Sequence, residues 1–373
     1  MREGIAFLRT YPDLWRLFWS NALWTLGSGL YFFIWPNYVR DLGGGPREIG
    51  YLTALMYGVM ALSLLPGGWL ADRLDRRRLM LANWAVASFA PLLFAFARSW
   101  TGLIPGVFLY AQFFGWPAME AYVAGVVPQA SLGRAFALTN SGYALGATLS
   151  PLLGALLLPY LGMRGLFLLA FLAFAGSTFL IGCLHPQRPR VRADPSAAPA
   201  FPAALWPWVA VFAGVSLVSA ALRPFLPVFL EDRFGVGRSW ILASSSLLSL
   251  GGFVLAWPLG HGSARNPARA LAWGLTGMAL GVLLLFLPFG LIPGLFLFGA
   301  DAAVYSLLRG LIGSQGALGR VFGATQVPAT LAQALAPLAA GWFYAASPTL
   351  FLGTGAGLLL LLALLSWHLG KPR

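Results

Sequence analysis

The sequence predicts an all-α polytopic membrane protein in which twelve transmembrane helices form two pseudo-symmetric six-helix bundles. Its composition, its series of long apolar segments and an internal repeat support this prediction. Of the 373 residues, 59% are hydrophobic and only 9% are charged, whereas about 25% are charged in an ordinary soluble domain. So much apolar surface requires lipid as its solvent.

The apolar segments have the length that a membrane requires. A helix that crosses the hydrocarbon core needs about 20 apolar residues. Twelve segments joined by short connections meet this condition: 14–38, 49–71, 79–97, 101–126, 135–160, 164–184, 206–230, 239–260, 268–288, 291–313, 321–345 and 348–369.

One long polar segment divides the chain near its midpoint. Residues 185–202 read HPQRPRVRADPSAAPAFP, and their prolines and charges are typical of a linker. We therefore expect an N-terminal bundle over 1–184, a cytoplasmic linker over 185–202 and a C-terminal bundle over 203–373.

The distribution of basic residues predicts the orientation. A net charge of +13 would suggest nucleic-acid binding in a soluble protein, but here the arginines lie in loops between apolar segments. Sixteen of the 24 Lys and Arg residues fall on the side that holds both termini and six on the other side. Positively charged loops stay inside. We therefore expect cytoplasmic termini, a bacterial inner-membrane location and no nucleic-acid partner.

An internal repeat relates the two halves. A shift of 186 residues places 132–134 (LGR) on 318–320 (LGR) and Pro151 on Pro337. The matched segments open the fifth and eleventh spans, which hold equivalent places in the two halves. A parallel repeat of six helices is found in one large class of secondary transporters.

The loop after the second span carries the most specific motif. Residues 67–78 (GGWLADRLDRRR) resemble the signature loop of the major facilitator superfamily, Gly-x-Leu-Ala-Asp-Arg-x-Gly-Arg-Arg/Lys, although Asp75 replaces the second glycine. The resemblance implies the major facilitator fold, transport by alternating access, a monomer, and a loop that gates the cytoplasmic side. The expected gating residues are Gly68, Asp72, Arg73, Arg76 and Arg77. The alternative is a loop whose arginines only set the topology.

The fifth span partly matches a motif associated with antiporters of this family. Gly146, Pro151 and Gly154 hold positions of Gly-x8-Gly-x3-Gly-Pro-x2-Gly-Gly. This match favours export by antiport, whereas the alternative is close packing through small residues. The fourth span has Ala111 and Phe114 where many proton-coupled drug exporters of the family carry Arg and Gln, so coupling through that arginine is not expected.

Four ionisable residues lie well inside predicted spans, away from the span ends. They are Glu120, Arg223, Asp301 and Arg309. A charge at the bilayer centre costs about 2.5–3.5 kcal/mol, so each should face a cavity or a partner. We interpret Glu120 and Asp301 as proton-coupling carboxylates, and Arg223 and Arg309 as groups that compete with the proton or bind an anionic substrate. The alternative is structural salt bridges between the halves.

Aromatic and amide side chains are interleaved in the first and fourth spans. The candidates for substrate binding are Asn21, Trp24, Tyr31, Gln112 and Trp116. Such a surface suits lipophilic or planar compounds, which stack on aromatic rings. The alternative is lipid-facing side chains and interfacial aromatic belts.

Enzymatic activity is not expected. The sequence has no Gly-x4-Gly-Lys-Ser/Thr loop for phosphate, no Ser/His/Asp or metal-ligand spacing, and one cysteine, Cys183. We therefore expect no catalytic residues, no metal and no cofactor, with the proton gradient as the energy source. The preferred interpretation is proton-coupled efflux of lipophilic or amphipathic small molecules, with membrane lipid as the surroundings. The alternatives are a carrier for a specific metabolite, such as a sugar or organic anion, and a lipid-handling protein on the same scaffold.

Overall fold

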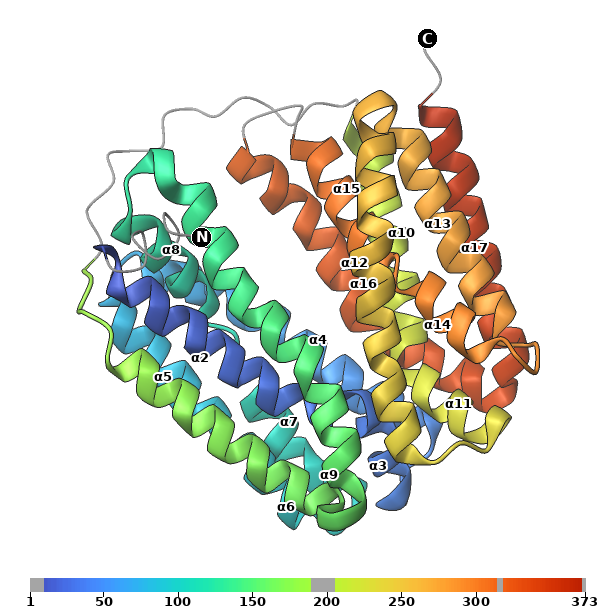
Figure 1. Cartoon of the computed structure of the whole chain (residues 1–373), viewed down its shortest axis with the longest axis horizontal. Helices are drawn as coiled ribbons and strands as arrows, with labels where there is room; N and C mark the ends of the chain where they lie inside the picture. Colours follow the sequence, from blue (N-terminus) through green and yellow to red (C-terminus); the bar gives the residue numbers. More distant parts are fainter. Residues whose placement is uncertain (1–9, 189–204, 314–317, 371–373) are drawn as a thin grey trace. The chain divides into compact units, whose positions relative to one another are not determined.

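The computed structural model describes residues 10–188, 205–313 and 318–370, and within these ranges every regular element is a helix (Figure 1). In chain order the first elements are α2 (Pro12–Gly29), η1 (Phe32–Ile34), α3 (Trp35–Asp41), α4 (Pro46–Ala71), α5 (Arg76–Ser88), α6 (Ala90–Phe96), η2 (Trp100–Leu103), α7 (Ile104–Tyr110), α8 (Trp116–Val126), η3 (Gln129–Ser131) and α9 (Leu132–Gly182). They are followed by α10 (Trp206–Leu222), η5 (Arg223–Phe225), α11 (Leu226–Phe234), α12 (Arg238–Arg265), α13 (Pro267–Leu284), α14 (Leu291–Phe298), α15 (Asp301–Gly313), α16 (Leu318–Ala346) and α17 (Pro348–Leu369).

Within the described residues, eight helical segments are long and apolar enough to cross a membrane. The longest, α9, has 51 residues and is interrupted at Gly162, whose φ of +61° favours glycine. Two spans were predicted here, over 135–160 and 164–184. The expected all-helical membrane fold is confirmed. The predicted first, fourth and eleventh spans are not among these eight segments, and they correspond to α2–α3, η2–α8 and α16.

The chain divides into two compact units. One contains Met1–Gly43 with Leu55–Asp194, and the other contains Gly44–Ala54 with Pro195–Arg373. Residues 189–202 of the predicted linker lie outside the described residues. The boundaries expected at 184 and 203 therefore remain predictions.

Small residues bring α2 and α9 together in the N-terminal unit, where the two helices lie side by side (Figure 1). A Cβ atom at Gly142 would overlap the Phe18 carbonyl oxygen, and one at Gly146 would overlap the Ala22 carbonyl oxygen. Pro151 and Gly154 are buried further along the same helix. The small residues of the fifth span therefore allow α9 to contact the backbone of α2 directly.

The C-terminal unit uses the same kind of contact between α12 and the tenth span. A Cβ atom at Gly251 would overlap the Phe296 carbonyl oxygen, and one at Gly299 would overlap the Leu248 carbonyl oxygen. Elsewhere in this unit α13 lies along α17, and α10 lies along α16 (Figure 1).

Candidate functional site

The fourth span is broken in its middle. Helix α7 ends at Tyr110 and α8 begins at Trp116, and residues 111–115 between them are not helical. Pro117 in the first turn of α8 is suited to starting a new helix, because its missing N–H is not needed there. In an apolar environment the backbone groups freed by such a break must find other partners.

Asn83 of α5 supplies two of these partners. Its Nδ2 donates to the Gln112 carbonyl at 2.7 Å, and its Oδ1 accepts from the Gly115 N–H at 2.6 Å. The Phe113 N–H donates to the Ser63 hydroxyl of α4 at 2.8 Å. A side-chain amide therefore replaces the lost helical hydrogen bonds and fixes the shape of the break.

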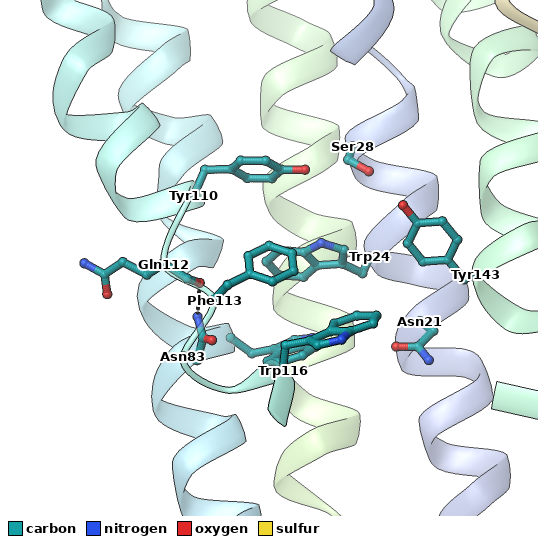
Figure 2. Close-up of a pocket in the computed structure, with 10 residues that line it drawn as sticks. Asn21, Trp24, Ser28, Asn83, Tyr110, Gln112, Phe113, Trp116 and Tyr143 are labelled. Atoms are coloured by element: carbon teal, nitrogen blue, oxygen red, sulfur yellow. Dashed lines mark hydrogen bonds between the residues drawn. The ribbon is translucent and has the colours of Figure 1, made fainter. Parts of the chain in front are cut away.

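The break opens onto a pocket within the N-terminal unit (Figure 2). The cavity volume is about 80 Å³, which exceeds what a single water needs. Its lining comes from five helices and the break itself: Asn21, Trp24, Ser28, Asn83, Trp84, Tyr110, Gln112, Phe113, Trp116 and Tyr143. Six of these ten are aromatic and four are uncharged polar residues.

Stacked rings hold Trp24 in place at the centre of this lining. The Trp24 ring stacks on Phe174 at a centroid distance of 4.0 Å and lies nearly parallel to Tyr110 at 6.3 Å. Trp84 lies 5.6 Å away at a tilt, and Trp116 packs at 5.7 Å against Phe113. This geometry offers flat apolar walls to a planar compound.

A carboxylate lies beside the pocket, one helical turn along α8. Trp116 Nε1 donates to Glu120 Oε1 at 3.1 Å, and Glu120 is exposed. The proposed proton-coupling residue is therefore in direct contact with a pocket-lining ring and lies at the surface of its unit.

Four of the five predicted N-terminal binding residues line this pocket: Asn21, Trp24, Gln112 and Trp116. In Figure 2 the Gln112 side chain points away from the rings, so this residue contributes its backbone. Tyr31 lies elsewhere, because its ring is 1% exposed and packs on Phe167 at 4.8 Å.

Sequence reasoning missed Asn83, Trp84, Tyr110 and Tyr143 as candidates. A signal existed for Asn83, because an amide in the apolar segment 79–97 needs a partner. The others resemble the many aromatic residues of a membrane helix, and their role depends on packing between helices.

The second carboxylate, Asp301, opens α15 and is buried in the C-terminal unit. Arg223 Nε donates to its Oδ2 at 2.9 Å, and the Arg223 Nη2 contacts the same oxygen. The partner thus belongs to the same half, whereas the structural alternative placed such bridges between halves. Arg309 is exposed, and no ion pair to it occurs in the described residues.

The signature loop binds the segment that leaves the N-terminal bundle. Arg76 Nη1 donates to Gln187 Oε1 at 2.7 Å and to the Ala121 carbonyl at 3.0 Å. Arg77 donates to the Gly182 carbonyl. Within their own unit, these two arginines hold the end of the sixth span and the residues that follow it.

Asp75, which departs from the family pattern, has a local role. It is the N-cap of α5 and accepts from the Arg78 N–H at 2.9 Å. Arg73 lies over the Trp69 ring at 4.0 Å, and Asp72 is exposed. A Cβ atom at Gly68 would meet no described atom within 4 Å, whereas the neighbouring Gly67 packs against Phe114 of the break.

A cluster of polar side chains surrounds Asp13, which lies just before the first predicted span. Asp13 accepts from the Tyr122 hydroxyl at 2.6 Å and from Arg16 at 2.7 Å, and lies 2.9 Å from His185 Nδ1. Burial raises the pKa of the Asp13 carboxyl, but the hydrogen bonds from Tyr122, His185 and Arg16 outweigh burial and hold that pKa below its usual value.

Comparison with known proteins gives a family match and distant relatives. A family model described as Major Facilitator Superfamily matches residues 17–315. The enterobactin exporter EntS of Escherichia coli O1:K1 is 25% identical over 333 residues, which cover 82% of this chain and 78% of that protein. The niacin transporter NiaP of Acinetobacter baylyi is 28% identical over 163 residues, 41% of this chain and 37% of that protein.

Solved structures share the fold. A bacterial homologue of the human lysosomal transporter Spinster, in an inward-facing and occupied conformation, matches with a TM-score of 0.76 at 14% identity, over 95% of this chain and 96% of that one. A variant of the peptide transporter POT in complex with alafosfalin matches with a TM-score of 0.78 at 15% identity, over 96% and 94%.

Proposed function

Because the chain belongs to the major facilitator superfamily, a family of membrane-spanning transporters and not of enzymes, we propose that it exports lipophilic or amphipathic small molecules in exchange for protons. The export would cross the bacterial inner membrane by alternating access, with both termini cytoplasmic. The protein would act as a monomer without a cofactor, and the proton gradient would supply the energy.

The observation that carries this proposal is the aromatic pocket at the break of the fourth span. Its lining is mostly aromatic and uncharged, which favours planar, lipophilic compounds over sugars. Interrupted helices near the middle of a span build substrate sites in other transporters. Most of the substrate-binding residues proposed from the N-terminal sequence belong to this lining.

The two intramembrane carboxylates would carry the coupling protons. Glu120 is exposed and accepts from the Trp116 indole of the pocket wall, so a substrate in the pocket would lie beside it. Asp301 is buried against Arg223, and a proton and the guanidinium are alternative partners for the same carboxylate. Protonation of Asp301 would therefore release Arg223, and deprotonation would recapture it.

A specific metabolite carrier is the second candidate. The match to a niacin transporter over 163 residues favours it, as do the two intramembrane arginines of the C-terminal half, Arg223 and Arg309, whose charge suits an anion. In this alternative Arg309, which is exposed, would contact substrate.

Transport of ethidium into proteoliposomes under an imposed pH gradient tests the proposal. We expect wild-type protein to transport the dye in a gradient-dependent way, and Glu120→Gln or Asp301→Asn to abolish that dependence. Glu231→Gln is the matched control, because Glu231 belongs to the C-terminal unit and pairs with Arg238 at 3.0 Å. Wild-type protein that transports no more dye than empty liposomes, while it transports niacin, would replace this proposal by the second candidate.

A further inference from the structure

We propose that the pocket selects planar aromatic compounds that carry a neutral hydrogen-bond acceptor, such as a ring nitrogen or carbonyl oxygen, and that the Trp24 indole N–H donates to this acceptor. This inference rests on the proposed function, since it names the substrate class of the same site.

The walls of the pocket select for flat rings. Trp24 is fixed by the stack on Phe174, with an interplanar angle of 9°, and by the parallel Tyr110 ring at 12°. A ring stacked on a neighbour in this way keeps its edge, and therefore its N–H, in one direction. A compound that enters beside this edge meets a donor that has little freedom left to lose on binding.

The pocket has indole donors that lack acceptors. Trp116 Nε1 is used by Glu120, but in the described part of the chain neither Trp24 Nε1 nor Trp84 Nε1 has an acceptor. Trp84 is only 7% exposed. Buried donors are nearly always satisfied, and one without a partner points to a missing water or ligand. Trp24, which is partly exposed in the pocket, is the donor that a ligand would reach first.

Two of the acceptors that line the pocket are already used at the break. Asn83 Oδ1 takes the Gly115 N–H, and the Gln112 carbonyl takes the Asn83 Nδ2. Neither can serve the indole groups without freeing a backbone partner. A ligand that brings its own acceptor satisfies an indole N–H without disturbing the break.

The charge around the pocket argues against an anionic acceptor. None of the residues that line it is charged, and the charged group in contact with its wall is the Glu120 carboxylate. A ligand carboxylate would lose its hydration, find no cation and be repelled by Glu120. A ring nitrogen or carbonyl oxygen loses little hydration and gains the indole hydrogen bond.

Equilibrium binding of three compounds of the same shape tests the inference. The probes are quinoline, which carries a ring nitrogen that is neutral at pH 8, naphthalene, which carries no acceptor, and 2-naphthoate, which is an anion. Binding to protein in nanodiscs is measured by dialysis, with empty nanodiscs to subtract partition into lipid. We expect wild-type protein to bind quinoline about threefold to tenfold more tightly than naphthalene, as one net hydrogen bond implies, and 2-naphthoate most weakly.

Trp24→Phe keeps an aromatic ring in the stack and removes the N–H. We expect this variant to lose the preference for quinoline while its affinity for naphthalene changes less than about twofold. Trp273→Phe, on the exposed surface of the C-terminal unit, should leave the order of the three affinities unchanged.

Three outcomes overturn the inference: equal wild-type affinities for quinoline and naphthalene, 2-naphthoate as the tightest ligand, or a preference for quinoline that persists in Trp24→Phe. The first two need no variant, so a misfolded substitution leaves the test intact. Selective binding without gradient-driven transport would support the inference and overturn the proposed function. Transport of ethidium without this selectivity would do the reverse.

Discussion

The fourth and tenth spans are interrupted at equivalent places in the two halves, but to different extents. Phe113 in the first interruption and Gly299 in the second are 186 residues apart, the spacing of the internal repeat. The fourth span loses its helix over 111–115 and depends on Asn83. The tenth loses it only at 299–300, where the backbone N–H groups still donate to the Leu295 and Leu297 carbonyls.

The side chains at the two interruptions also differ in charge. Uncharged rings and amides surround the first, whereas the Arg223–Asp301 ion pair occupies the second. Both halves are therefore interrupted at the same place in the repeat, and the side chains around each interruption determine its function. In our proposal the neutral interruption binds the substrate and the charged one takes part in proton coupling.

The largest expected effect is on substitution of Asn83, because its amide makes two of the hydrogen bonds that hold the first interruption. Asn83→Leu leaves the Gln112 carbonyl and the Gly115 N–H without partners, which we expect to cost about 2–4 kcal/mol. The thermal unfolding midpoint of the purified protein measures the effect.

Asn266→Leu is the matched control for Asn83→Leu. Asn266 also accepts from one backbone N–H, of Arg269 at 3.0 Å, and donates to one carbonyl, of Gly370 at 3.3 Å, but it does so at an exposed helix start. We expect a loss of about 1 kcal/mol there. Equal losses at the two positions would contradict the role assigned to Asn83.

A smaller effect is expected at Gly299, where the second interruption depends on close packing and not on an amide. Gly299→Ala would force a methyl group against the Leu248 carbonyl, at a cost of about 1–3 kcal/mol. Gly310→Ala in the same span meets no described atom within 4 Å and should stabilise the helix by about 0.5–1 kcal/mol. Thermal unfolding of both variants checks whether the two substitutions differ in sign.

The smallest effect concerns the polar end of the N-terminal half. Because the folded protein holds the pKa of Asp13 below its usual value, this carboxylate adds stability above the pKa of the unfolded chain, and the addition is lost as the pH falls through the folded pKa. We expect Asp13→Asn to be less stable than wild type by about 1 kcal/mol at pH 7, and the difference to shrink between pH 5 and pH 3.

Unfolding midpoints measured across this pH range test the Asp13 prediction. Glu231→Gln, which breaks a partly exposed ion pair in the other half, should cost less at pH 7. A difference between Asp13→Asn and wild type that stays constant down to pH 3 would show that the Asp13 charge does not carry the effect.

The sequence was sufficient for the features that depend on local composition. Apolar length, the loop motif at 67–78 and the repeat predicted the helical membrane fold and the family, both now confirmed. The predicted joint between the fifth and sixth spans falls at Gly162, where the helix is interrupted. These features require only a count of residues along one helix.

The pocket could be predicted only in part, because several helices build it. Asn21 and Trp24 share one face of α2, a pattern that is visible in the sequence, but the helical period alone also placed Tyr31 with them. The structure packs Tyr31 into a separate aromatic cluster around Phe167. The break at 111–115 was predicted as continuous helix, since its cause is a bond from Asn83 on another span.

The central claim, that the aromatic pocket at the first interruption binds the substrate and that Asp301 at the second takes part in proton coupling, is tested most directly by measuring ethidium binding and gradient-driven ethidium transport on the same preparations. We expect Asp301→Asn to bind ethidium within about twofold of wild type and to lose the gradient dependence of transport. Trp24→Ala should weaken binding by about tenfold and keep that dependence. Weakened binding in Asp301→Asn, together with unchanged binding in Trp24→Ala, would place the substrate in the C-terminal half and contradict the account.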